Sequence, residues 1–116
     1  MTNLTDMSVQ TWESKRTAET RQVEEALRNA GFEKVDAYRY NSASIRLRVI
    51  DSQFDGLSRE KRDALVEPYL EQLPERTQAD IMTLFTFTPA EVQQTPEKFK
   101  GYFLNAEFEH PSPSML

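Results

Sequence analysis

The chain has 116 residues, of which 38% are hydrophobic and 28% charged, a composition typical of one globular domain with one modest core. It contains no cysteine, which excludes disulfides and thiolate chemistry, and its three glycines are isolated, which excludes a glycine-rich phosphate-binding loop. The net charge of -5 argues against nonspecific binding to nucleic acid or to an anionic membrane, because both require a summed positive field.

The N-terminal region is expected to be a flexible segment over residues 1–16, because it is mostly polar, with Trp12 as the exception. It lacks the basic and apolar parts of a signal peptide, and no apolar run in the chain approaches the roughly 18 residues of a membrane span. We therefore expect a cytoplasmic protein.

A first helix is predicted from about residue 17 to residue 30, where apolar side chains recur at helical spacing and Gly31 can end the helix in a left-handed conformation. Two strands follow, because hydrophobic and polar residues alternate on both sides of the turn-forming residues 41–44. We expect an antiparallel hairpin with one partly basic face, since Arg46 and Arg48 share one side of the second strand.

A second helix is predicted to begin after Ser58, which can serve as its N-cap. Its apolar stripe is predicted to consist of Ala64, Leu65, Tyr69, Leu70 and Leu73. Pro68 is expected to kink or break this helix near Val66 and Glu67, because an internal proline removes a hydrogen bond and crowds the preceding turn. In the connector that follows, Pro74 can open one short helical turn.

Residues 80–88 give the strongest strand signal in the chain, rich in aromatic and β-branched side chains. Apolar residues occupy both sides of this strand, so we expect it to be covered on both faces or to leave one apolar face for a partner. Thr88 and Glu91 form a capping box that begins a third helix, and a second cue at Thr95 favours helix up to about Leu104.

The C-terminal extension, residues 96–116, is too apolar for an ordinary solvated terminus. We expect it to wrap the domain's own sheet. The alternative is that it docks on a partner or on a second copy of the chain, and the oligomeric state stays open.

The predicted order of helix, strand, strand, helix, strand and helix describes a small α+β domain in which helices cover one face of a three-stranded sheet. Over residues 17–95 the sequence resembles the BolA-like proteins, a family of small KH-type α+β domains. The resemblance rests on the runs RLRVID, SQFDGLSREKRDALV, LEQLP and TFTPAE. The matching positions are Phe54, Asp55, Gly56, Arg62, Leu65, Val66, Thr88 and Pro89.

This resemblance implies a non-enzymatic binding or regulatory module that acts through protein contacts. The family carries histidines in the second helix and just before the last strand, and the latter ligates an iron–sulfur cluster shared with a monothiol glutaredoxin. Asp63 and Asp80 stand at these positions here, and carboxylates are poor ligands for such a cluster. We therefore expect no iron–sulfur cluster, no other cofactor and no bound metal, and a glutaredoxin partner has only weak support.

The hinge before the second helix, with the basic residues around it, is the candidate interaction surface. It comprises Arg46, Arg48, Asp55, Gly56, Arg59, Lys61 and Arg62. One alternative is a nucleic-acid-binding transcriptional regulator, in which the five basic residues line one groove and Tyr38 or Tyr40 stacks on bases, although the hinge lacks the GxxG loop of KH domains. The other is a small metal-dependent enzyme in which Asp51, Asp55 and Asp63 hold magnesium.

Overall fold

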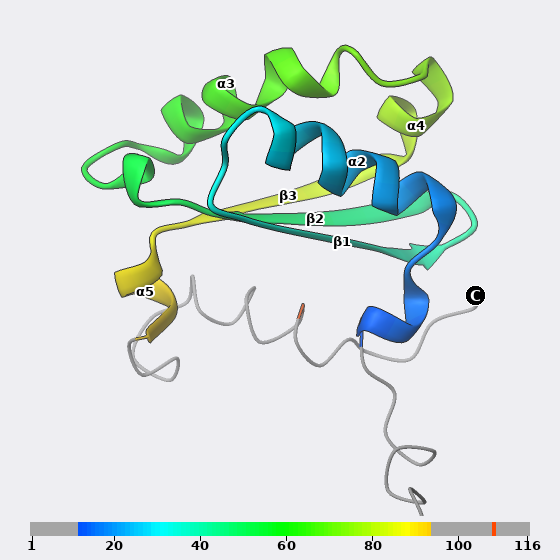
Figure 1. The fold of residues 1–116 in the computed structure, drawn as a ribbon, viewed down its shortest axis with the longest axis horizontal. Coiled ribbons are helices and arrows are strands. Elements are labelled where there is room, and N and C mark those ends of the chain that lie inside the picture. The colour runs from blue at the N-terminus through cyan, green and yellow to red at the C-terminus, as the bar shows by residue number, and fades with distance from the viewer. Residues whose placement is uncertain (1–11, 94–107, 109–116) are drawn as a thin grey trace, which may run out of the picture.

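The structure is a computed structural model that describes residues 12–93 and residue 108. The strands are β1 (Lys34–Asn41), β2 (Ser44–Ile50) and β3 (Ile81–Phe87). The helices are α2 (Ala18–Asn29), α3 (Arg59–Leu70), α4 (Glu75–Asp80) and α5 (Pro89–Gln93), with the short 3-10 helices η1 (Trp12–Lys15) and η2 (Ser52–Phe54). The strands form one mixed sheet in the order β1-β2-β3, in which β1 and β2 are antiparallel and β2 and β3 are parallel (Figure 1).

The first helix and the hairpin follow the predictions closely. Thr17 caps α2, because its hydroxyl accepts from the Thr20 backbone N–H and the Thr20 hydroxyl accepts in return from the Thr17 N–H. Gly31, with φ of 103°, ends the helix in the left-handed region. The antiparallel hairpin of β1 and β2 is confirmed.

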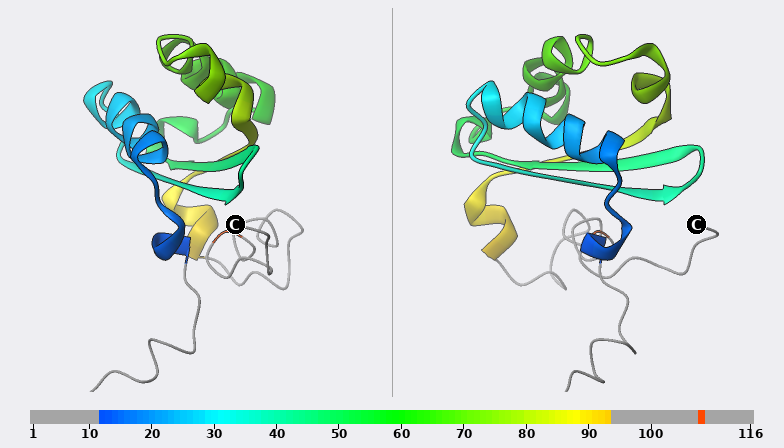
Figure 2. Two further views of the ribbon diagram at one scale, coloured as in Figure 1. Left: turned by 90° about the vertical axis from the view of Figure 1, so that its right-hand side faces the viewer. Right: turned by 45° about the vertical axis from the view of Figure 1, so that its right-hand side comes forward.

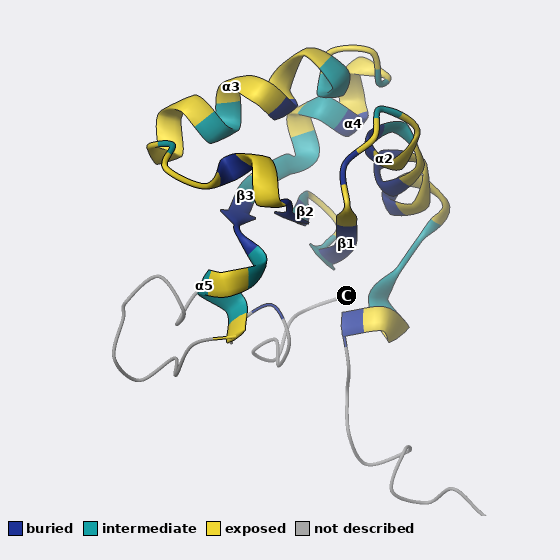
Figure 3. Cartoon of the chain, turned by 60° about the vertical axis from the view of Figure 1, so that its left-hand side comes forward, coloured by how far each residue is buried: buried dark blue, intermediate teal, exposed yellow. Residues whose placement is uncertain are grey.

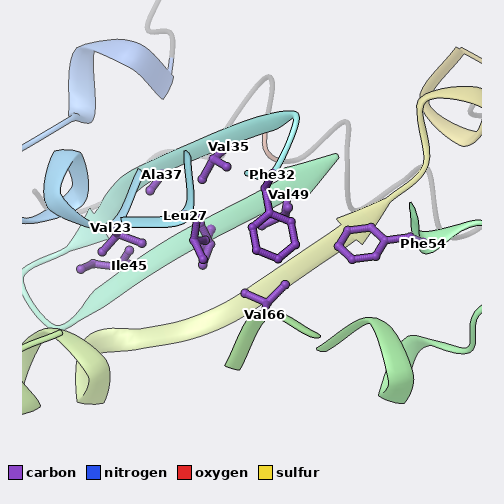
Figure 4. Packing of buried hydrophobic residues seen from close by; sticks show 10 residues of the cluster. Val23, Leu27, Phe32, Val35, Ala37, Ile45, Val49, Phe54 and Val66 are labelled. Atoms are coloured by element: carbon purple, nitrogen blue, oxygen red, sulfur yellow. The ribbon is translucent and has the colours of Figure 1, made fainter. Parts of the chain in front are cut away.

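The main hydrophobic core lies between one face of the sheet and the helices α2 and α3, which run side by side above it (Figure 2). Val23 and Leu27 from α2 and Val66 from α3 are fully buried against Leu47 and Val49 of β2. In the cartoon coloured by burial, the buried part of α2 lies on the side toward the strands and its exposed part on the outer side (Figure 3). The close view shows Leu27, Phe32 and Val66 meeting above the sheet (Figure 4). Burial of this layer is the main source of stability.

The opposite face of the sheet carries a second, mainly aromatic cluster. It consists of Trp12, Tyr38, Ile50, Phe85, Phe87 and Phe108. Because Phe85 and Phe87 lie in this cluster while Leu84 packs on the main core, the first of the two predicted alternatives, a last strand covered on both faces, is confirmed. Trp12 is buried in η1, so the packed part of the chain begins before Thr17.

The predicted break at Pro68 is wrong, because α3 continues through this proline to Leu70. Pro68 stands in the last turn, so the helix extends only two residues beyond it, and Tyr69 and Leu70 are held there by packing on the main core. The apolar stripe predicted for α3 also differs from the observed one. Val66 is its buried centre, whereas Ala64 and Leu65 are exposed.

The short helical turn predicted after Pro74 is confirmed as α4, which the predicted order did not count as a separate helix and which leads directly into β3. The alternation of β3 is also interrupted. Ile45 pairs with Ile81 and Arg46 with Thr83, so Met82 has no partner residue on β2 and is 67% exposed. Ile81 therefore packs on the main core, whereas Phe85 and Phe87 face the other way.

The predicted capping box at the start of the last described helix is confirmed. The Glu91 carboxylate accepts from the Thr88 backbone N–H at 2.8 Å, and the Thr88 hydroxyl accepts from the Glu91 N–H at 3.2 Å. The helix predicted from Thr95 to about Leu104 lies outside the described residues. The α+β class is confirmed, and within residues 12–93 no helix combines the length and apolarity that a membrane span requires.

Candidate functional site

The sheet divides the seven predicted surface residues into two groups. Arg46 and Arg48 pair with Thr83 and Phe85, and therefore belong to the face that carries the aromatic cluster. The other five residues lie in the hinge between η2 and α3 and in the first turn of α3, beside the free edge of β3. The five basic residues consequently do not line one groove.

Arg48 lies inside the protein, which corrects the expectation that it contributes to a surface. Its side chain is 1% exposed, and Nη2 donates to Oδ2 of Asp36 at 2.8 Å. Its guanidinium also lies 4.4 Å from the centroid of the Phe108 ring. A buried ion pair of this kind holds the two strands in register but offers no charge to a partner.

Arg46 is half-buried at the same face. Its guanidinium lies 4.0 Å from the centroid of the Tyr40 ring, and Nη1 donates to the Tyr38 hydroxyl at 2.9 Å. The two tyrosines that were candidates for stacking on bases therefore contact Arg46 instead.

Two buried residues, Phe54 and Asp51, anchor the hinge to the rest of the domain. Phe54 is fully buried in the main core, and Asp51 caps η2 by accepting from the Gln53 N–H at 2.9 Å. Asp51 also accepts from the Glu33 N–H at 2.9 Å, so both of its oxygens are engaged. Gly56 has φ of 76°, in the left-handed region that favours glycine. These contacts define the path of the exposed turn.

The first turn of α3 is exposed apart from Arg62. Ser58 caps the helix as predicted, because its hydroxyl accepts from the Lys61 N–H at 3.3 Å. Arg59 reaches the strand edge and donates from Nη2 to the Leu84 carbonyl at 3.0 Å, whereas Asp55, Gly56 and Lys61 lie at the surface.

Arg62 joins four parts of the structure. It donates to the carbonyl of Leu57 in the hinge and to the carbonyl of Thr86 on β3, each at 3.0 Å. It also forms a two-armed ion pair with Glu91 of α5, with N–O distances of 2.9 and 3.0 Å. Because its side chain is only 12% exposed, Arg62 is a structural junction and a minor part of the surface.

Helix side chains cover both edges of the sheet. At the β3 edge, Arg59 and Arg62 occupy outward carbonyls. At the β1 edge, the buried Glu24 accepts from the Ala37 N–H at 2.8 Å, and Arg28 donates to the Val35 carbonyl at 3.1 Å. Charged side chains at these positions oppose the pairing of another strand with either edge.

The pKa values of two carboxyl groups beside the hinge are shifted in opposite directions. Hydrogen bonds from Arg62 hold the pKa of Glu91 below its ordinary value, helped by the Thr88 backbone N–H and opposed by burial. Burial raises the pKa of Asp63, which the nearby charge of Arg59 and the hydroxyl of Thr86 only partly oppose. Within the described part of the chain, neither Asp63 Oδ1 nor Thr86 Oγ1 makes a well-formed hydrogen bond.

The three hinge aspartates do not form a metal site. Asp51 is buried and bonded to backbone N–H groups, Asp55 is exposed, and Asp63 faces Thr86. Residues 12–93 and 108 contain no group of three or more histidine, aspartate or glutamate side chains that could hold a metal ion.

The two aspartates at the family's histidine positions also lie apart. Asp80 accepts from Nη2 of Arg39 at 2.8 Å at the start of β3, whereas Asp63 lies near Thr86 at its end. Thr86 lies six positions after Asp80 along the chain, which is roughly 20 Å of strand at 3.3 Å per residue. Asp80 thus has a structural role, in which Arg39 also binds Glu19 and the hairpin carbonyl of Ser42.

Sequence reasoning missed the buried charges Glu24, Asp36 and Arg39. For Asp36 and Arg39, the alternation of residues along the strand does indicate burial. Arg39 continues the alternation that buries Val35 and Ala37, and Asp36 shares the side of Tyr38, so each stands where the strand pattern expects a buried residue.

Comparison of the whole chain with models of known protein families and with curated proteins finds no match.

Proposed function

We propose that this chain is a non-enzymatic binding or regulatory module of BolA-like, KH-type architecture that acts in the cytoplasm through contacts with another protein. The observation that carries this proposal is the hinge surface, defined as the exposed residues Asp55, Gly56, Arg59 and Lys61. It coincides with four of the seven residues that the sequence indicated.

Neighbouring residues fix the path of the backbone that carries the hinge surface. Phe54 anchors the turn in the core, and Ser58 caps the helix that follows. A surface that is ordered before binding loses less conformational entropy when a partner docks. This pre-organisation supports a role in recognition.

The charge of the hinge surface favours a protein partner over a nucleic acid. Arg59 and Lys61 contribute two positive charges, and Asp55 and the neighbouring exposed Glu60 contribute two negative ones, so the local sum is zero. A polyanion gains little from such a surface, whereas a protein with alternating charges can match it.

The test is a charge exchange that preserves the net charge of -5. The double variant Asp55→Lys/Lys61→Glu reverses the charge of two exposed side chains that make no side-chain hydrogen bond or ion pair with residues 12–93 or 108. Arg21→Glu/Glu25→Lys is the matched control on the exposed side of α2. Each tagged full-length protein is used to capture partners from its native lysate, and the captured protein is then purified and titrated.

A partner that binds the wild type and the control, and binds the hinge variant at least tenfold more weakly, supports the proposal. Equal binding by all three proteins would place the contact elsewhere. Capture of nucleic acid, lost on Arg46→Ala, would favour the transcriptional regulator instead.

A further inference from the structure

Two arginine side chains bind helix α3 to the free edge of β3, and a carboxyl group lies at the same contact. Arg59 donates from Nη2 to the Leu84 carbonyl, and Arg62 donates from Nη1 to the Thr86 carbonyl, each at 3.0 Å. Asp63 follows Arg62 on the same helix and faces Thr86. Asp63 therefore belongs to the contact through which α3 meets β3.

Two polar atoms at this contact lack a hydrogen bond. Among the described residues, Oδ1 of Asp63 and Oγ1 of Thr86 are both buried, and neither has a hydrogen-bond partner. Buried polar atoms in folded proteins are nearly always bonded, because an unmade bond leaves the cost of desolvation uncompensated. A protonated Asp63 can meet this requirement with a small movement, since its O–H can donate to the Thr86 hydroxyl and no charge is buried.

An ionised Asp63 has a different requirement, because a buried carboxylate is stabilised most by a nearby cation. Arg59 is the cation that faces it, one helical turn earlier on α3. A bond from a guanidinium to a carboxylate is stronger than one to a backbone carbonyl. Since Arg59 is exposed, its side chain can turn between the two acceptors, and an ionised Asp63 competes with the Leu84 carbonyl for it.

The other charged groups around Asp63 do not offer it a cation. Arg62 is bound to Glu91 of α5 through both arms of its guanidinium. Glu60 and Glu67, three and four positions away on α3, are exposed and have the same sign as the carboxylate. The strand Ile81–Phe87 carries no ionisable side chain.

We propose that Asp63 is a proton-dependent switch for the side chain of Arg59. While the carboxyl group is protonated, Arg59 donates to the Leu84 carbonyl, as in the structure. Once the group is ionised, Arg59 turns to the carboxylate and leaves this carbonyl free at the edge of β3. Because Arg59 belongs to the hinge surface, that surface changes with pH. The effect on a partner rests on the proposed function, whereas the switch itself is a property of the free protein.

The transition is expected above pH 3.8, the ordinary pKa of the group. The reason is that burial raises the pKa of Asp63 more than the charge of Arg59 and the hydroxyl of Thr86 lower it. The pKa of Glu91 is instead lowered, chiefly by its hydrogen bonds from Arg62, so the two carboxyl groups are followed separately.

The test is a nuclear magnetic resonance titration of the labelled full-length protein between pH 3 and pH 7, with no partner present. The signals followed are the Asp63 carboxyl carbon, the Leu84 carbonyl carbon and the Arg59 guanidinium nitrogens. All three should change with one shared midpoint. In Asp63→Asn the changes at Leu84 and Arg59 should disappear. The matched control Asp55→Asn, which neutralises the exposed aspartate of the hinge, should keep them.

Arg59→Gln is a second variant, which keeps the test decisive if Asp63→Asn does not fold. Removal of the cation should raise the midpoint of the Asp63 carboxyl and abolish the transition at the Leu84 carbonyl. These two effects belong together, because a charge that changes the position of Arg59 must itself be affected by Arg59.

Either of two results would overturn the proposal. One is a titration of Asp63 that leaves the Leu84 and Arg59 signals unchanged, or changes in these signals that follow the midpoint of Glu91. The other is a full pH response of Leu84 in Asp63→Asn or in Arg59→Gln. Because no partner takes part, failure of this test is distinct from failure of the proposed function.

Discussion

Arg48 and Asp36 face each other across the antiparallel pair of β1 and β2, and Nη2 of Arg48 lies 2.8 Å from Oδ2 of Asp36. Both side chains are nearly inaccessible to water. Arg48→Met should therefore reduce the free energy of unfolding by about 3 kcal/mol, because it removes the 2.8 Å partner of a buried carboxylate whose other cation, Arg16, lies 3.9 Å away. Urea unfolding followed by circular dichroism measures this.

The double variant Arg48→Met/Asp36→Leu should recover most of that loss, since apolar side chains of similar volume need no charge partner. Arg21→Met on the exposed side of α2 serves as the control and should change stability by less than about 0.5 kcal/mol. A double variant as unstable as the single one would show that the ion pair is not the source of the effect.

Because of Glu91, we expect the folded protein to lose stability in acid. Its pKa is lowered in the folded protein by hydrogen bonds from Arg62, so its contribution is fully present above the ordinary pKa of about 4.5 and is lost as the pH falls through the folded value. The difference in Tm between the wild type and Glu91→Gln should therefore shrink between pH 6 and pH 3. A difference that stays constant over this range would contradict the assignment.

For Asp63 we expect the opposite dependence of stability on pH. Burial raises its pKa in the folded protein, so its contribution is fully present below the ordinary value of 3.8 and is lost as the pH rises through the raised value. Asp63→Asn should therefore gain stability relative to the wild type as the pH rises from 3 to 7. Thermal unfolding of both proteins across this range provides the measurement, and a relative loss would refute the prediction.

Gly56 is required by its backbone conformation. Its φ is 76°, and a Cβ built there meets no atom within 4 Å, so Gly56→Ala should cost only the strain of the left-handed region, about 1–2 kcal/mol. Gly56→Asn should cost less, because asparagine tolerates this region better. Chemical unfolding distinguishes the two variants, and equal stability of Gly56→Ala and the wild type would disprove the argument.

The elements that were predicted well are those determined by nearby residues. The helix capped at Thr17, the hairpin around residues 41–44 and the capping box of Thr88 and Glu91 each depend on contacts within a few positions along the chain. Such signals are visible in a sequence because the interacting groups are neighbours in it.

The candidate site was predicted in part. The exposed turn around Asp55 and Gly56 and the helix start at Ser58 follow from local turn and capping chemistry. The roles of Arg48 and Arg62 do not, because Asp36 lies 12 positions from Arg48, and Thr86 and Glu91 lie 24 and 29 positions from Arg62. A row of basic residues looks the same in a sequence whether it is solvated or bonded.

The sequence by itself determined the α+β class, the approximate positions of the three strands and the starts of α2, α3 and α5, because these follow from periodicity and capping. The tertiary structure alone decided which side of α3 is buried, why Pro68 does not end it, and where the charged side chains lie. The physical reason is that burial and ion pairing depend on what the chain folds against. Val66 rather than Leu65 faces the sheet, and Arg59 and Arg62 meet the carbonyls of β3, only because α3 packs across the strand edge.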